Sequence, residues 1–278
     1  MKPTRFTVDS ARNGVTLMEF IASALNLSRN RAKALVDTRN VFVNRRRVWM
    51  ARHTLSTGDV VEMSESGGEK PNTQSRLRIL FGDDQYVVVD KPAGMLSNGA
   101  ISAESVLKEQ LAQPSIVAVH RIDKDTSGCL LLAKGARAFD AAVAQFKKHE
   151  VAKTYHAIVR GYLDPPVQTI TTAIQGERAV TKVKTLVATP AASHVVVNIE
   201  TGRTHQIRRH LAAAGAPVMG DSHYGVRTEA TRKTLHVARQ MLHASSIEFT
   251  HPVTQRHVKV SASLPDDFRR CLGLFNLK

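Results

Sequence analysis

Apolar and polar residues recur along the chain with two periods, one typical of helices and one typical of strands. Near the start, residues 17–25 carry apolar side chains at helical spacing. Residues 32–36 repeat this spacing behind Ser28 and Asn30, which are both typical helix caps. The pattern therefore predicts two short helices.

Two β-prone runs, 41–43 and 47–49, follow these helices and flank the polar residues 44–46. A short polar turn between such runs predicts a tight hairpin. A further strand is expected at 60–63, directly after a Thr-Gly-Asp turn. These elements together indicate a small α/β domain.

The apolar periodicity stops between residues 64 and 76. The segment Ser-Gly-Gly-Glu-Lys-Pro-Asn-Thr-Gln-Ser is flexible and polar, as linkers are. We therefore expect a first domain over 1–66, a linker over 67–76 and a second domain over 77–278.

The second domain shows an irregular succession of elements. A turn is expected at 91–94, where Pro92 fixes φ and Gly94 permits a left-handed residue. The expected helix covers 137–148, and the expected strands cover 77–81, 86–90, 153–161, 180–187 and 194–199. Because helices and strands do not alternate regularly, the pattern favours an α+β fold over a parallel α/β fold.

Charge narrows the class of partner. The chain has 278 residues, with 39 Lys and Arg against 24 Asp and Glu, a net charge of +15 and a pI near 10.2. Such a balance predicts a polyanionic partner, nucleic acid above all. No basic amphipathic helix, secretory leader or membrane-spanning run is evident, and two distant cysteines support no disulfide framework. We expect a cytoplasmic monomer that binds no membrane.

The stretch 119–128 places acidic residues in a basic turn between two apolar runs, 116–119 and 129–133, which we expect to be buried strands. Asp123 lies among His120, Arg121 and Lys124, whose charges would favour its ionised form if folding brings them together. An ionised carboxylate suits covalent or base chemistry. The alternative is an Asx turn in which the carboxylate only caps backbone N–H groups.

A second polar centre lies around residues 205–214, where a helix is expected with Thr204 as its cap and Gly215 as its end. Its apolar side can pack while Arg208 is held beside it. A fixed guanidinium can then address a carboxylate. The alternative is a surface salt bridge with a helix neighbour.

Metal and cofactor motifs were sought because the chain has 12 His. His205 and His210 are five residues apart, whereas paired ligands on one helical face are four apart, and no His-Glu-x-x-His motif is present. A Gly-rich phosphate loop is also missing. We expect no metal and no cofactor.

The turn sequence HRIDKDTSG resembles the signature of the large-subunit-rRNA and tRNA branch of the pseudouridine synthases. Four further segments are similar to that family in the same order: VVVDKPAGML at 87–96, KTYHAIVRG at 153–161, ETGRTHQIRRHLAAAGAPVMGDSHYG at 200–225 and LHASSIEFTHP at 242–252. The resemblance implies a mixed, largely antiparallel sheet around a central catalytic cleft.

The resemblance also implies roles for individual residues. Asp123 would be the catalytic residue, Arg208 the guanidinium that pairs with it, and Tyr155 the aromatic side chain that stacks on the base. The remaining implied contacts to substrate or RNA are those of Arg121, His120, Arg203, Arg209 and Leu242, the last as an apolar wall of the uracil pocket. Arg121 would occupy the gap left by the displaced uridine.

The segment LNLSRNRAKALVDTRNVFVNRRRVW resembles the αL-type RNA-binding module of ribosomal proteins and tyrosyl-tRNA synthetases. Clustered cations support RNA contact over a merely solvated face; they are Arg29, Arg31, Lys33, Arg39, Arg45, Arg46, Arg47 and Arg52. The module implies an rRNA substrate, with tRNA as the alternative.

Three classes of function are therefore weighed. The first is isomerisation of uridine to pseudouridine in structured RNA. The second is a noncatalytic RNA-binding or ribosome assembly factor, which the charge alone would explain. The third is a nucleoside hydrolase or glycosylase that uses a single carboxylate. Release of tritium from the fifth carbon of uracil, or of free uracil, distinguishes them.

Overall fold

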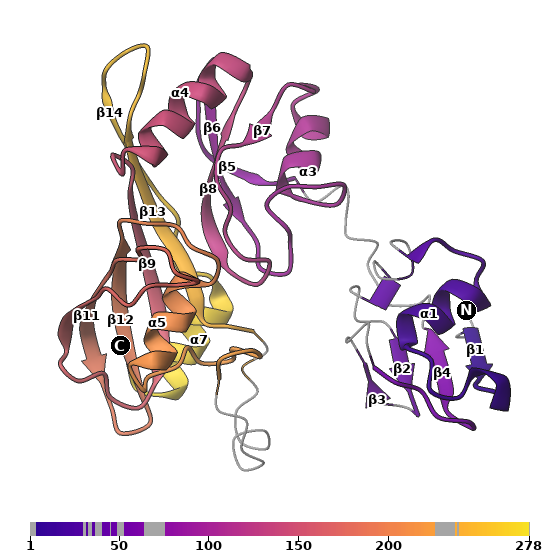
Figure 1. Cartoon of the computed structure of the whole chain (residues 1–278). Coiled ribbons are helices and arrows are strands. Elements are labelled where there is room, and N and C mark those ends of the chain that lie inside the picture. The colour runs from indigo at the N-terminus through magenta and orange to yellow at the C-terminus, as the bar shows by residue number, and fades with distance from the viewer. Residues whose placement is uncertain are drawn as a thin grey trace. The chain divides into compact units, whose positions relative to one another are not determined.

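The computed structural model describes residues 4–29, 32, 35–36, 41–44, 46–48, 53–63, 76–225, 237 and 239–277. The chain divides into two compact units, Met1–Ser75 and Arg76–Lys278 (Figure 1). All of the expected linker except Arg76 lies outside the described residues, so its bounds stay a prediction.

The first unit has four strands and a well-capped helix. The strands β1 (Thr4–Thr7), β2 (Val41–Val43), β3 (Arg46–Arg47) and β4 (Val60–Met63) form an antiparallel sheet in the order β1-β4-β2-β3. A short 3-10 helix, η1 (Ser10–Arg12), and α1 (Leu17–Ala24) follow β1. Thr16 and Glu19 form a capping box at the start of α1. The expected first helix, hairpin and last strand are confirmed; most of the expected second helix lies outside the described residues.

The second unit is built on a single mixed sheet. Its strands are β5 (Arg78–Gly82), β6 (Tyr86–Lys91), β7 (Val117–Ala118), β8 (Ser127–Ala133), β9 (Ala152–Arg160), β10 (Val167–Ile170), β11 (Thr181–Ala188), β12 (Ala192–Ile199), β13 (Leu242–Thr250) and β14 (His257–Ser261). The order is β10-β11-β12-β9-β13-β8-β6-β5, with β14 beside β13 and β7 beside β8. The α+β prediction is confirmed.

The two halves of this sheet meet where β8 and β13 run parallel. His243 pairs with Ser127 and Ala244 with Gly128, whereas the other pairings described in the sheet are antiparallel. The expected catalytic turn directly precedes β8, so it lies at this junction.

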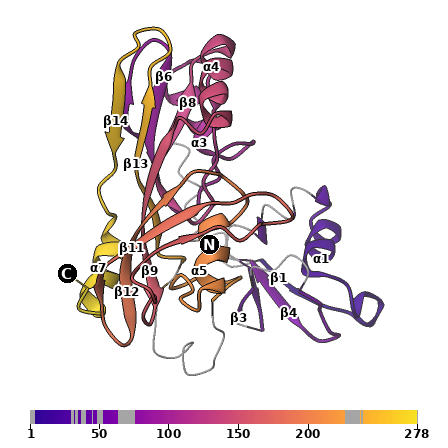
Figure 2. The same cartoon turned by 60° about the vertical axis from the view of Figure 1, so that its left-hand side comes forward.

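Helices cover both faces of the sheet. The helices within the described residues are α3 (Ala103–Gln110), α4 (Ala136–Lys147), α5 (Gln206–Ala213) and α7 (Asp266–Leu274). Because successive strand residues face opposite sides, Ala157 packs in the cluster that contains α5 residues, while its neighbour Ile158 packs with α7 residues. Figure 2 shows α5 and α7 on either side of β9, β11 and β12. In the other half, α3 and α4 likewise pack on opposite faces of β6 and β8.

Several expected elements differ from the structure. The run 116–119 forms only the two-residue strand β7, whose residues are half-buried, whereas β8 is buried along its whole length. Five described elements of the second unit were not predicted: β10, β13, β14, α3 and α7. Within the described ranges, none of the helices combines the length and apolar character needed to cross a bilayer.

Candidate active site

The turn that carries Asp123 is fixed from several sides. Thr126 donates its backbone N–H to the Asp123 carbonyl at 3.0 Å, and the Lys124 carbonyl accepts from Gly94 N at 2.8 Å. The fully buried Lys91 ammonium also donates to this carbonyl at 3.1 Å. Burial lowers the pKa of Lys91 to about 7. A backbone held by so many contacts presents the Asp123 side chain in one orientation.

Gly128 ends this turn at a place where no larger residue fits. Its φ is +110°, and an added Cβ would lie 2.2 Å from the carbonyl oxygen of Ala244 on β13. Glycine therefore permits the close approach of β8 and β13. The turn and the junction of the two half-sheets depend on each other.

The helix α5 begins differently from the prediction. Thr204 does not cap it: the N-cap is His205, with φ of 55°, and no side chain caps the first turn. Instead, Gln206 Oε1 accepts from Arg203 N at 3.1 Å and from the Thr201 hydroxyl at 2.7 Å. The glutamine side chain thus closes the turn in place of a threonine hydroxyl. The predicted end is confirmed, since Gly215 has a φ of +77°.

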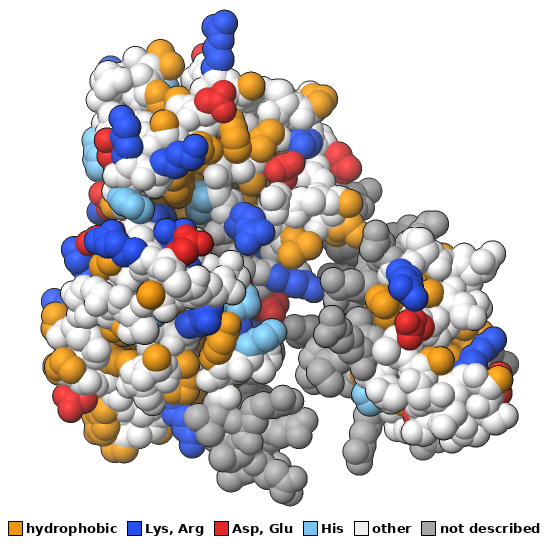
Figure 3. All heavy atoms as spheres, viewed as in Figure 1, with side chains coloured by type: hydrophobic (Ala, Val, Ile, Leu, Met, Phe, Trp, Pro, Cys, Tyr) orange, Lys and Arg blue, Asp and Glu red, His pale blue; other side chains and the backbone are white. Residues whose placement is uncertain are grey.

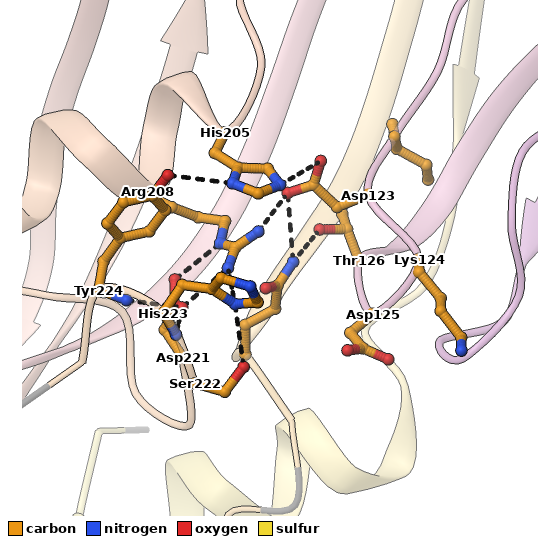
Figure 4. Close-up of polar contacts among 12 residues, drawn as sticks. Asp123, Lys124, Asp125, Thr126, His205, Arg208, Asp221, Ser222, His223 and Tyr224 are labelled. Atoms are coloured by element: carbon orange, nitrogen blue, oxygen red, sulfur yellow. Dashed lines mark hydrogen bonds and ion pairs between the residues drawn. The ribbon is translucent and has the colours of Figure 1, made fainter. Parts of the chain in front are cut away.

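Arg208 lies between two carboxylates (Figure 4). Its Nη1 donates to Asp123 Oδ2 at 2.9 Å, as expected. Its Nε and Nη2 donate to Asp221 Oδ2 and Oδ1 at 2.7 and 2.8 Å. The guanidinium also lies over the Tyr224 ring, 5.3 Å from its centroid. The side chain is only 4% exposed, so its direction is fixed by packing as well as charge.

Asp123, Arg208 and Asp221 form a hydrogen-bonded triad. Its contacts favour the charged forms of Arg208 and Asp221. Burial would lower the pKa of Arg208, but its hydrogen bonds to Asp221 and Asp123 outweigh burial and raise it. Burial would raise the pKa of Asp221, but hydrogen bonds from Arg208, His223 N and Tyr224 N lower it below the usual value. Two carboxylates and one guanidinium leave one net negative charge beside the cavity.

Asp123 is the member of the triad that solvent reaches, because 28% of its side chain is exposed, against none of the Asp221 side chain. Gln240 Nε2 donates to Thr126 Oγ1 at 2.8 Å and lies 3.5 Å from Asp123 Oδ2. His205 Nε2 lies 3.9 Å from Asp123 Oδ1. Burial, with the charge of Arg208, lowers the pKa of His205 despite the nearby Asp123.

Asp123 faces a cavity of about 630 Å³. Of the residues expected to act there, Asp123, Tyr155, Arg208, Leu242, Arg121, His120 and Arg203 line it. Burial and the charge of Asp123 raise the pKa of Tyr155, so its phenol stays protonated. The volume is within the range of small-molecule sites.

The expected cations occupy different surroundings. Arg121 is exposed at the cavity, and Arg203 contacts Glu177 and donates to the Arg178 carbonyl. Arg209 is half-buried and is not part of the cavity wall. Lys and Arg side chains recur across the face of the second unit that Figure 3 shows.

His120 has a structural position. Its Nε2 accepts from Leu131 N at 3.1 Å, and its ring stacks on Phe146 with centroids 5.1 Å apart. Burial lowers the pKa of His120 to about 3, so the ring is neutral and cannot attract RNA as a cation. The expectation that its charge would act on Asp123 is wrong for this reason.

Most of the cations expected to contact RNA in the first unit lie outside the described residues. Arg29 is 75% exposed and lies 3.5 Å from Glu19. Arg31, Lys33 and Arg45 lie outside the described residues, and the Arg46 side chain is not described. Their RNA contacts stay predictions.

Sequence reasoning missed several residues of the site. Asp221, Tyr224 and His223 were inside a quoted motif but received no role, and Gln240 was not singled out. A signal for Asp221 was a lone carboxylate directly after the apolar run Ala-Pro-Val-Met-Gly. Within the described ranges, no group of three or more His, Cys, Asp or Glu is arranged to hold a metal ion.

A partly exposed carboxylate held by a buried guanidinium, on the wall of a cavity of about 630 Å³, defines a candidate active site. Residues 85–213 match the family model of the RNA pseudouridylate synthases. An uncharacterized RNA pseudouridine synthase of Mycobacterium bovis is 33% identical, over 91% of this chain and 92% of the relative. The ribosomal large subunit pseudouridine synthase C of Vibrio cholerae is 30% identical, over 95% and 94%.

The fold is shared with a solved structure. The solved structure of human RNA pseudouridylate synthase domain containing 4 covers 75% of this chain and 96% of its own, with a TM-score of 0.63 and 23% identity. The chain belongs to the RNA pseudouridine synthases. It is therefore an isomerase that acts on RNA, the first of the three classes weighed above.

Proposed function

We propose that large-subunit ribosomal RNA is the substrate of this synthase and that Asp123 carries its reaction. The observation on which the second part rests is the contact of Asp123 with Arg208 at 2.9 Å, on the wall of the cavity. The name of the Vibrio cholerae relative and the excess of positive charge support the first part.

The target uridine must leave its stack to reach Asp123. A stacked base does not expose its glycosidic bond, and flipping it out costs a few kcal/mol. Arg121, exposed at the cavity, would occupy the gap left in the RNA. The surrounding positive charge would offset part of the cost through attraction of phosphates.

Asp123 then breaks the glycosidic bond by one of two routes. Its carboxylate attacks the anomeric carbon of the ribose, or it removes the proton of the adjacent sugar carbon to give a glycal. In both, the electron pair of the broken bond leaves with the uracil. The uracil rotates and its fifth carbon bonds to the anomeric carbon. In the first route the bond between Asp123 and the ribose breaks as this bond forms, and in the second the adjacent sugar carbon regains the proton that Asp123 removed. The proton on the fifth carbon passes to solvent, and the uracil nitrogen that left the ribose takes up a proton.

The other residues keep this sequence confined. Arg208 would hold Asp123 in place through the charge-assisted hydrogen bond from its Nη1 to Asp123 Oδ2, while its other two donors are fixed by Asp221. Tyr155 would stack on the base, and its hydroxyl would help with proton transfer. Leu242, buried at the cavity, would form an apolar wall. A uracil that escaped would turn the enzyme into a glycosidase.

Two experiments test the proposal. Pseudouridines are mapped across total RNA from cells with and without the protein, and we expect one or more large-subunit rRNA positions to lose the modification. Loss confined to tRNA would contradict the assigned substrate.

The second experiment concerns Asp123. The variant Asp123→Asn keeps the size of the side chain and removes its charge, so we expect tritium release from uracil-labelled RNA to stop while RNA affinity is retained. Pseudouridine formation by Asp123→Asn at the wild-type rate would rule out the assigned role.

A further inference from the structure

One buried cation of the cavity has no part in the triad. Lys153 lies on β9, two residues before Tyr155, so the two side chains share one face of the strand. Both line the cavity, and Lys153 is only 8% exposed. Its ammonium lies over the ring of Phe146, 5.4 Å from the centroid, and His120 stacks on the same ring.

Lys153 lacks an anionic partner. In the part of the chain that the structure describes, no carboxylate lies within ion-pair distance of its Nζ, and this nitrogen forms no hydrogen bond. By contrast, Lys108, Lys182 and Lys259 each contact a glutamate at 2.8 to 2.9 Å while being more exposed. The arrangement thus reverses the usual one, in which buried charges are paired.

The environment of Lys153 is unfavourable without an anion. Burial lowers its pKa to about 8, which leaves the ammonium mostly charged at neutral pH. The Phe146 ring offers a weak attraction, on the order of 1 kcal/mol. His120 is neutral, so this ring supplies no negative charge to Lys153. The carboxylate of Asp123 is already engaged by Arg208.

We propose that Lys153 is the core of a phosphate subsite, which binds a backbone phosphate next to the flipped uridine. A phosphate supplies the full negative charge that a buried ammonium lacks, whereas uracil and ribose are neutral and do not. RNA brings one such charge with every nucleotide. This inference rests on the proposed function, because it takes the cavity to hold a nucleotide of the substrate RNA.

The first test measures affinity and its salt dependence. The probe is the rRNA fragment that carries the mapped uridine, and all proteins also carry Asp123→Asn to prevent turnover. Lys153→Met is expected to bind about 10- to 100-fold more weakly, the effect of one charged hydrogen bond. The slope of log affinity against log salt should become shallower by about 0.7 to 0.9, the value of one lost phosphate contact. Unchanged affinity and slope would overturn the proposal.

The matched control is Lys259→Met. Lys259 lies on β14, is 61% exposed and is not part of the cavity wall. The variant Lys259→Met removes the same charge from the same unit as Lys153→Met. Because Lys259 lies away from the cavity, we expect no loss of RNA affinity. An equal loss in both variants would mean that only net charge matters, which contradicts a subsite.

The second test identifies the phosphate. Methylphosphonates, which lack the charge, replace the phosphates around the target uridine one at a time. With Lys153 present, one position should weaken binding about 10-fold or more. With Lys153→Met, the same position should cost nothing further. Additive losses would show that lysine and phosphate do not interact.

Two further measurements keep the result decisive. If Lys153→Met does not fold, Lys153→Arg should fold and keep the methylphosphonate effect. If no methylphosphonate position weakens binding by the protein that has Lys153, the proposal is overturned. In turnover assays, Lys153→Met with Asp123 intact should raise KM and leave kcat near wild type. If the wild-type chain modifies no RNA, the proposed function fails; if it does and Lys153→Met binds normally, only the subsite fails.

Discussion

Replacing Asp221 by asparagine tests whether the Arg208 bridge supports the fold as well as the site. Asparagine has the same size but one oxygen in place of two. If that oxygen keeps the contacts of Oδ1 with His223 N and Tyr224 N, the amide NH₂ faces Arg208 Nε, now 2.7 Å from Oδ2. Two N–H donors, the asparagine amide and Arg208 Nε, would then face each other, and the buried Arg208 guanidinium would lose a charged partner.

The magnitude follows from burial. The Arg208 and Asp221 side chains are 4% and 0% exposed, so solvent does not screen their interaction. Removing one partner of a buried pair costs about 3 to 5 kcal/mol, and the lower value applies because Asp123 still contacts Arg208. For a unit of this size, about 3 kcal/mol corresponds to a fall in Tm of roughly 6 to 12 °C.

The pH dependence gives a second check. The pKa of Asp221 is lowered in the folded state, so its contribution to stability is present above the unfolded value near pH 4 and is lost as pH falls through the folded value. Urea unfolding of wild type and Asp221→Asn should therefore differ by a constant free energy between about pH 5 and pH 8, and converge in stronger acid. Equal Tm values at neutral pH would refute the reasoning.

Three further substitutions have definite expected outcomes. Lys91→Met should cost about 3 kcal/mol in urea unfolding, because the partly buried carbonyls of Pro92, Met95 and Lys124 each lose a charged donor; a loss below 1 kcal/mol would contradict this. Gly128→Ala should prevent folding, because the added Cβ would meet the Ala244 backbone. Gly94 also has a left-handed backbone but lies in open space, so Gly94→Ala should cost about 1 to 2 kcal/mol of stability. Equal Tm values of the two variants would refute the steric argument. Tyr155→Phe should keep RNA affinity and lower turnover about 100-fold, and unchanged turnover would exclude proton donation.

Local patterns in the sequence predicted most strands of the sheet, including β5 at one edge, but missed β13 in its middle and β10 at the other edge. The apolar run 129–133 lies in β8, and the strands at 86–90 and 194–199 were placed within two residues of their observed bounds. Such central strands are buried on both faces, so their composition is distinctive. β10 at the edge is half exposed, with a burial pattern that no local rule separates from a loop.

The site was predictable only where a motif carried it. Asp123 and Arg208 are 85 residues apart, so their contact came from the resemblance and not from spacing. Gln240 lies 117 residues from Asp123 and Asp221 follows a turn, and nothing local indicates which carboxylate a distant guanidinium will meet. His205 was expected to be the first residue of the helix, but it has a left-handed backbone. This conformation accompanies the contacts that the Gln206 side chain makes with the preceding turn, and no local pattern indicates them.

The parallel pairing of β8 with β13 sets the order in which activity can arise during translation. A ribosome delivers Asp123 early, its guanidinium 85 residues later, and the last partner, Gln240, only just before β13. A nascent chain that stops short of β13 carries Asp123 without the strand that closes its surroundings. If Asp123 carries the reaction, we therefore expect no modification of RNA before β13 has been synthesised.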